Sequence, residues 1–150
     1  MICEGSMQDE KIKKWLEQAK TIAVYGMQDE SRPETPAYQI PKHVQQYGYV
    51  IYPVNPKIQS SLGCKAYAKL EELPIRPDIL NVFRKSEWIP KIVDEIQALP
   101  VEKRPFLVWL QTGISHVAAE DQLREMGIEV VSNECLGVAV SRFLPKPGSD

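Results

Sequence analysis

The chain has 150 residues, of which 43% are hydrophobic and 25% are charged, as is ordinary for a soluble globular protein. Its formal net charge of −2 argues against a protein that binds nucleic acid through a basic surface. No apolar run approaches the roughly 20 residues that a membrane-spanning helix needs, and residues 1–12 lack the pattern of a signal or transit peptide. We therefore expect a cytoplasmic protein with no membrane or nucleic-acid partner.

The length predicts one domain over residues 1–150, in which residues 1–8 form a loose leader and residues 144–150 a loose tail. The three cysteines are widely spaced, so neither a disulfide framework nor a cysteine zinc site is expected. No other group of residues has metal-ligand spacing, and we predict no metal site. Residues 9–19 predict a first amphipathic helix, because an apolar stripe recurs there at helical spacing.

The chain is organised around residues 20–47. Residues 21–25 are a short apolar run, typical of a strand buried on both faces. Gly26 ends it, since a residue without Cβ lets the backbone turn sharply and approach a ligand closely. A polar loop then leads into a helix whose apolar face is formed by Ala37, Ile40, Val44 and Tyr47. Strand, glycine turn and helix open a nucleotide-type βαβ unit, in which the helix N-terminus provides an anion site.

The rest of the chain alternates strands with helices. Helices are predicted at residues 65–73, 86–99 with Ser86 as N-cap, 117–126 and 135–143, and strands at residues 49–54, 78–83, 106–110 and 128–131. This alternation predicts an α/β fold of three layers, a doubly wound, parallel five-stranded sheet with the strand order 3-2-1-4-5 along the chain. The ligand is then expected at the carboxyl ends of the strands, on the loops that follow Tyr25, Val54, Phe83 and Leu110.

These loops fit a dinucleotide poorly and a phosphate better. Of the dinucleotide fingerprint only Gly26 is present, with Gln28 and Ser31 at the later glycine positions. The second strand leads to Lys57 where an NAD-binding protein needs an acid. Lys57 and Arg32 suit a phosphate, and Ser31 and Thr35 add hydroxyl donors. By position alone each cation is more often a solvated loop residue; their predicted convergence on one crevice favours a binding role.

The third and fourth exit loops offer other chemistry. Phe83, Arg84 and Trp88 place aromatic surface beside charge, suited to a stacked ring or an acyl-type arm, although core packing explains Trp88 equally well. At the fourth exit, hydrogen-bonding groups and a close backbone approach come from Gln111, Thr112 and Gly113.

A resemblance to a known family rests on five segments, AVYG, SRPETPAY, GYVIYPVNPK, DILNVFR and VWLQTGI. Together they resemble the stand-alone CoA-binding protein family, Rossmann-like domains similar to the CoA-binding part of the succinyl-CoA synthetase alpha subunit. The resemblance covers residues 9–142. It implies CoA or an acyl-CoA as ligand, with its phosphates near the first loop, the following helix and residues 55–57.

Together with the residue patterns above, the resemblance implies a set of cofactor-binding residues: Gly26, Met27, Gln28, Ser31, Arg32, Thr35, Ala37, Tyr38, Pro53, Asn55, Pro56, Lys57, Phe83, Arg84, Trp88, Gln111, Thr112 and Gly113. Two departures from the family pattern stand out. In the first loop, bulky Met27 and acidic Asp29 and Glu30 are expected to narrow the crevice or repel phosphate. Near the end of the chain, apolar residues replace the family's Glu-His pair after Cys135.

No residue pattern predicts a catalytic site. His116 is better explained as a helix-start residue, and Cys135 as a buried structural cysteine rather than a thiol that faces CoA. We therefore expect a non-catalytic CoA or acyl-CoA binding domain that serves as a carrier, sensor or regulatory module; a protein partner is left open. Two alternatives are an enzyme on the same fold, either an NADP-type oxidoreductase or an acyl-CoA ligase fragment, and a protein-interaction module with a vestigial crevice.

Overall fold

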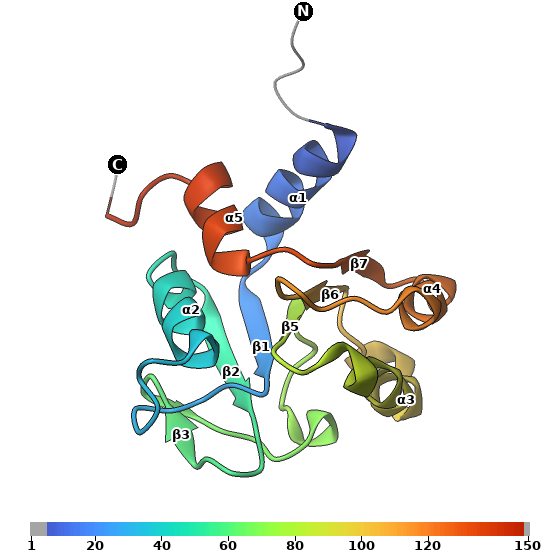
Figure 1. The fold of residues 1–150 in the computed structure, drawn as a ribbon, viewed down its shortest axis with the longest axis horizontal. Coiled ribbons are helices and arrows are strands. Elements are labelled where there is room, and N and C mark those ends of the chain that lie inside the picture. The colour runs from blue at the N-terminus through green and yellow to red at the C-terminus, as the bar shows by residue number, and fades with distance from the viewer. Residues whose placement is uncertain (1–5, 149–150) are drawn as a thin grey trace, which may run out of the picture.

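A computed structural model describes residues 6–148, and Figure 1 shows the arrangement of its elements. Three short 3-10 helices are η1 (Leu70–Glu72), η2 (Ser86–Trp88) and η3 (Val101–Lys103). The α-helices are α1 (Met7–Gln18), α2 (Pro36–Gln45), α3 (Ile89–Ala98), α4 (Val117–Glu125) and α5 (Leu136–Phe143). The strands are β1 (Thr21–Tyr25), β2 (Val50–Val54), β3 (Ser60–Ser61), β4 (Cys64–Lys65), β5 (Ile79–Val82), β6 (Leu107–Leu110) and β7 (Glu129–Val131).

Five parallel strands form the central sheet, which confirms the predicted doubly wound α/β fold. Helices α1, α2 and α5 cover one face of the sheet, and α3 and α4 cover the other (Figure 1). Every residue of β5 and β6 is buried, as their uninterrupted apolar runs require of strands covered on both faces. Each face therefore has its own apolar core, and the strand ends are left to carry function.

The strand order differs from the predicted one. The third long strand along the chain, β5, pairs with β1 rather than with β2, and the sheet runs β2-β1-β5-β6-β7. In the numbering of the prediction the order is 2-1-3-4-5 instead of 3-2-1-4-5. The burial pattern agrees with this correction, since Val50 of the edge strand β2 is 52% exposed whereas β5 is wholly buried. The order reverses between β1 and β5, so their carboxyl ends flank the expected binding crevice.

The prediction of a helix at residues 65–73 is wrong. Lys65 belongs to a two-stranded hairpin of β3 and β4, and only Leu70–Glu72 turn, as the 3-10 helix η1. Tyr67 extends beside β2, because its backbone N–H donates to the Pro53 carbonyl at 2.9 Å and its carbonyl accepts from Asn55 N at 2.9 Å. The spacing of three between Leu70 and Leu73, which suggested an α-helix, also suits a 3-10 turn and buries both side chains.

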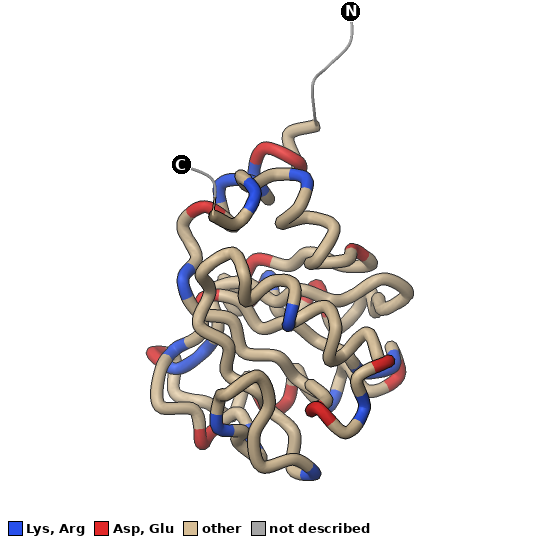
Figure 2. The backbone as a smooth tube through the Cα atoms, turned by 90° about the vertical axis from the view of Figure 1, so that its left-hand side faces the viewer, with Lys and Arg blue, Asp and Glu red and all other residues tan. Residues whose placement is uncertain are grey.

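Two further boundaries need correction. Ser86 lies inside η2, and the N-cap of α3 is Trp88. The predicted leader already enters α1 at Met7, where the Ser6 side chain accepts a hydrogen bond from Asp9 N; residues 1–5 and 149–150 lie outside the described residues. Basic and acidic residues are interspersed along the backbone (Figure 2). In residues 6–148 no helix is both long and apolar enough to cross a bilayer.

Candidate functional site

The carboxyl ends of β1, β2, β5 and β6 open onto a crevice of about 960 Å³, where the fold predicts a ligand. Its lining joins these strand ends to the start of α2, the segment before η1 and the start of α5. The lining residues are Tyr25, Gly26, Gln28, Thr35, Pro36, Ala37, Ile40, Val54, Asn55, Pro56, Lys57, Ala68, Lys69, Phe83, Arg84, Lys85, Glu95, Gln111, Thr112, Gly113, Ile114 and Cys135.

At Gly26 the crevice wall leaves no room for a side chain. Its φ of +85° lies in the left-handed region, and a Cβ on it would lie 2.6 Å from the Phe83 carbonyl oxygen. Its backbone N–H donates to the Val54 carbonyl at 2.8 Å. Gly26 thus ties the ends of β1, β2 and β5 together at a distance that only glycine allows.

The loop after Gly26 is held in place by the chain that follows β2. Asn55 Nδ2 donates to the Met27 carbonyl at 2.8 Å, while Asn55 Oδ1 accepts from Lys57 N at 2.9 Å. The hairpin adds a bond from Ser61 Oγ to the Gln28 carbonyl at 2.8 Å. These bonds fix the loop relative to Lys57 before any ligand arrives.

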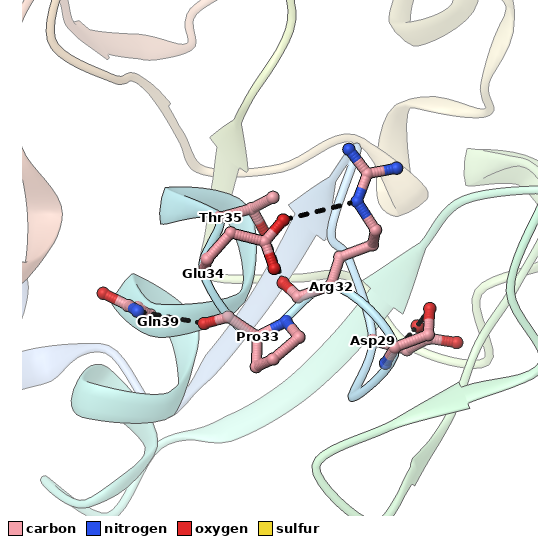
Figure 3. A network of polar contacts seen from close by, with 7 residues as sticks. Asp29, Arg32, Pro33, Glu34, Thr35 and Gln39 are labelled. Atoms are coloured by element: carbon pink, nitrogen blue, oxygen red, sulfur yellow. Dashed lines mark hydrogen bonds and ion pairs between the residues drawn. The ribbon is translucent and has the colours of Figure 1, made fainter.

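The charged side chains of the first loop turn to local partners (Figure 3). Arg32 Nε lies 3.6 Å from Glu34 Oε2, and Asp29 Oδ1 accepts from both the N–H and the hydroxyl of Ser31. The Ser31 hydrogen bonds hold the pKa of Asp29 below its ordinary value. Glu30 Oε2 accepts from Leu62 N at 2.8 Å. The expectation that Asp29 and Glu30 narrow the crevice is therefore wrong, since both carboxylates are engaged elsewhere and neither lines it.

The crevice is electropositive although the chain as a whole is negative. Four cationic side chains line it together with one carboxylate, Glu95. Both Glu95 oxygens lie within 3.0 Å of the Tyr25 hydroxyl, which donates to them. Burial, and secondly the bond to Glu95, raises the pKa of Tyr25 far above its usual range, so this hydroxyl stays protonated. The cations are Lys57, Lys69, Arg84 and Lys85.

A buried amide network forms the β6 side of the crevice. Gln111 is only 4% exposed, and its Oε1 accepts from Asn81 Nδ2 at 3.1 Å and from Leu136 N at 3.0 Å. Because Leu136 N is an obligatory donor, the oxygen and nitrogen of the Gln111 amide are assigned unambiguously. Asn81 Nδ2 also donates to the Trp109 carbonyl at 3.3 Å. The network ties β5, β6 and the start of α5 to one side chain.

The structure brings most of the predicted ligand residues to the crevice. Those that line it are Gly26, Gln28, Thr35, Ala37, Asn55, Pro56, Lys57, Phe83, Arg84, Gln111, Thr112 and Gly113.

Six predicted ligand residues do not line the crevice. Met27 is fully buried in the core beneath the loop, and Tyr38 and Pro53 are also buried. Ser31 and Arg32 lie on the outside of the first loop. Trp88 is 42% exposed, which also rules out core packing, and its ring lies beside the Arg84 guanidinium.

Several crevice residues were not predicted from the sequence. Lys69 lay in the wrongly predicted helix, and Glu95 lies on the polar side of α3, where a solvated residue is the usual interpretation. Lys85 follows Arg84 directly on the loop after β5, so its position at the end of a strand predicts a place in the crevice as it does for Arg84. Cys135 lines the crevice and is half-buried, which corrects its interpretation as a buried structural cysteine. His116 caps α4, with its Nδ1 accepting from Ala119 N at 3.2 Å.

Within residues 6–148 no three His, Cys, Asp or Glu side chains are grouped as a metal site would need. The groups with which the crevice can bind a ligand include its cations, the backbone N–H of Ala37 at the start of α2 and the Gln111 amide.

Known proteins are similar to this chain in sequence or in fold. The Bacillus subtilis (strain 168) protein YneT is 38% identical over 129 residues, which cover 86% of this chain and 91% of YneT. A structure from Thermus thermophilus, of cell-free ID.343, superposes with a TM-score of 0.83 at 39% identity, covering 92% of this chain and all of that one. An ADP-forming acetate–CoA ligase from Methanocaldococcus jannaschii is 22% identical over 130 residues, 83% of this chain but only 18% of the ligase.

The family match covers the whole of the crevice. Residues 20–141 match the family described as CoA binding domain, and this range contains every crevice residue from Tyr25 to Cys135. The chain belongs to the CoA binding domain family.

Proposed function

We propose that this protein binds CoA or an acyl-CoA in the crevice at the carboxyl ends of β1, β2, β5 and β6. The observation that carries the proposal is the local excess of positive charge, four cations against one carboxylate in a chain of net charge −2. CoA carries a diphosphate and a ribose phosphate, and several cations that line one crevice attract such a ligand.

The start of α2 supports a phosphate position in the same crevice. Thr35, Pro36 and Ala37 line it, and Thr35 is the N-cap without a side-chain capping bond. Pro36 has no N–H, and the N–H groups of Thr35 and Tyr38 already donate within this segment, so α2 offers the N–H of Ala37 and the positive end of its dipole. Lys57 projects from the neighbouring exit loop, whose backbone Asn55 fixes. Phosphate oxygens placed here would meet both a dipole and a cation.

The same crevice supports a binding role without turnover. The Tyr25 hydroxyl already donates to Glu95, and His116, whose Nδ1 caps α4, does not line the crevice. The ligase relative is more than five times the length that this chain matches, as its 18% coverage shows, and its activity is not transferred here. We propose a carrier, sensor or regulatory domain.

Calorimetric titration with CoA tests the proposal, with NADP as the control ligand because it also carries an adenosine with a ribose phosphate. We expect the heat of binding of CoA to saturate at one site per chain, and the heat of binding of NADP to be weaker or absent. No saturable heat from CoA or acetyl-CoA would contradict the proposal. Tighter binding of NADP than of CoA would favour an oxidoreductase-type pocket instead.

A further inference from the structure

Cys135 occupies an unusual position for a half-buried cysteine. It lines the crevice and is the N-cap of α5, where its side chain makes no capping hydrogen bond. Its Sγ lies 3.7 Å from the place of a Cβ on Gly137, and Ile40 of α2 lies 3.5 Å from the same place. The thiol therefore sits at the seam between α5 and α2, and Ile40 beside it lines the crevice as well.

Gln111, which bonds the backbone of the residue after Cys135, holds an unused hydrogen-bond donor. Its Oε1 is saturated by Asn81 and by the backbone N–H of Leu136, the residue that follows Cys135. Its Nε2 has no partner among the described residues, and yet Asn81 Oδ1 is the only buried side-chain polar atom in that range that is both unpaired and sealed from the surface. Gln111 Nε2 therefore keeps access to the crevice that Gln111 lines, and it presents N–H groups to a ligand oxygen there.

The two ends of the crevice thus differ in chemistry. The cations lie on the loops after β2 and β5 and before η1, whereas Gln111 and Cys135, which lie after β6 and before α5 on the β6 side of the sheet, are uncharged. CoA is divided in the same way, into a charged nucleotide half and an uncharged arm that carries amide carbonyls and ends in a thiol. If the phosphates of CoA lie beside the cations, its thiol arm lies at the Gln111 end of the crevice.

We propose that the Gln111–Cys135 end of the crevice receives the thiol arm of the ligand, and that Cys135 exchanges with a CoA disulfide to form a mixed disulfide with CoA. This inference rests on the proposed function, because it requires CoA to occupy the crevice. Gln111 Nε2 donates to a carbonyl of the arm, and this bond sets the sulfur beside Sγ.

The exchange is balanced without an additional oxidant. Cys135 loses its thiol proton to water, and the thiolate attacks one sulfur of the CoA disulfide. The Cys135–CoA sulfur–sulfur bond forms as the original sulfur–sulfur bond breaks, and the second CoA leaves as a thiolate that takes up a proton. One disulfide is consumed and one is formed. Reduced CoA or another thiol reverses the step, so the adduct reports the redox state of the CoA pool.

The test uses the full chain with Cys3→Ser and Cys64→Ser, so that Cys135 is the one thiol left. Mass spectrometry follows adduct formation with CoA disulfide and, as a control for general thiol reactivity, with glutathione disulfide. We expect modification by CoA disulfide to saturate with concentration and to exceed the glutathione rate by about tenfold or more, because binding holds the reacting sulfurs together. Desulfo-CoA, which has no thiol, should block it.

Gln111→Glu is the matched variant, since its carboxylate still accepts from Leu136 N and Asn81 Nδ2 but cannot donate to the ligand. It should lower the rate with CoA disulfide relative to the rate with glutathione disulfide, because any effect of the carboxylate on the thiol itself acts on both disulfides alike. Equal rates for both disulfides, or no adduct, would overturn the inference. Calorimetry on Cys135→Ser separates the two failures: CoA binding without an adduct in the parent refutes only the thiol-arm assignment, whereas absence of binding refutes the proposed function.

Discussion

The two ends of the crevice differ in the charge and the burial of the side chains that form them. The cationic end consists of exposed side chains on loops, among them Lys57, Lys69 and Arg84, and Asn55 fixes the backbone of the loop that carries Lys57. The uncharged end is a buried network in which Gln111 joins Asn81 to the first turn of α5. An exposed cation contributes attraction without supporting the fold, whereas a buried amide supports the fold as well as the site. Mutations at the two ends should therefore separate affinity from stability.

The largest effect is expected at Gly26, where the ends of β1, β2 and β5 meet. Gly26→Ala forces a residue with Cβ into a left-handed backbone, which lowers the free energy of unfolding by about 1–2 kcal/mol. The new Cβ also crowds the Phe83 carbonyl, which lowers the free energy of unfolding by about 1–3 kcal/mol more. Urea unfolding measures the loss of stability, and CoA titration should show greatly weakened binding. Gly113→Ala is the matched control, because Gly113 has nearly the same φ of +84° but no atom within 4 Å of a Cβ. Equal losses in the two variants would show that the Phe83 contact is unimportant.

The next largest effect is expected at the buried end. Gln111→Leu leaves Leu136 N without its acceptor in the interior and removes one of the two bonds from Asn81 Nδ2. A buried group left unsatisfied costs about 1–3 kcal/mol, so the free energy of unfolding should fall by that amount. The exposed neighbour Thr112 serves as control, with Thr112→Ala within about 0.5 kcal/mol of the parent protein. A Gln111→Leu protein as stable as its parent would show that the network does not hold α5.

A smaller effect, on affinity alone, is expected at the cationic end. Lys57→Ala should weaken CoA binding by about 1–3 kcal/mol, the range for hydrogen bonds to charged groups, and should reduce the salt dependence of binding. Its unfolding curve should match that of the parent protein. Lys13→Ala, on the exposed side of α1, controls for the loss of one positive charge anywhere on the surface. If both variants bind CoA equally well at low salt, Lys57 does not contact the phosphates.

The smallest effect is expected at Arg32. This side chain and its partner Glu34 are 60% and 69% exposed, and surface pairs of this kind contribute about 0–1 kcal/mol. Arg32→Ala should therefore change stability little and leave CoA affinity nearly unchanged, as measured by the same two experiments. A tenfold loss of affinity, which is about 1.4 kcal/mol, would mean that the first loop refolds around the ligand and turns Arg32 inward.

Much of the fold could be predicted from local patterns. Apolar runs such as residues 21–25 and 106–110 identify strands, and Gly26 marks the first turn, because burial on both faces and a left-handed backbone restrict the residues that fit. The strand order was not predictable in this way, since β5 pairs with β1 through contacts distant in sequence. The spacing of Leu70 and Leu73 misled because three-residue repeats suit a 3-10 turn as well as an α-helix.

The site was predictable to the extent that it consists of strand ends. Parallel strands present their carboxyl ends at one edge, so residues such as Lys57, Arg84 and Gln111 converge whatever the strand order. The spacing of apolar residues does not predict which side chains of the surrounding helices and loops face that edge. Met27 therefore turned out to face the core, while Glu95 and Cys135 entered the crevice from elements that had been placed correctly.

A nuclear magnetic resonance titration of the 150-residue chain with CoA shows directly whether CoA occupies the crevice at the carboxyl ends of the strands. If it does, the backbone amides of Gly26 and Gly113 and the Gln111 side-chain amide should show saturable shifts. A hollow of about 390 Å³ lined by Trp15, Ala19 and Phe106 provides the internal control. Shifts confined to that hollow, or none at saturating CoA, would show that CoA does not bind in the crevice.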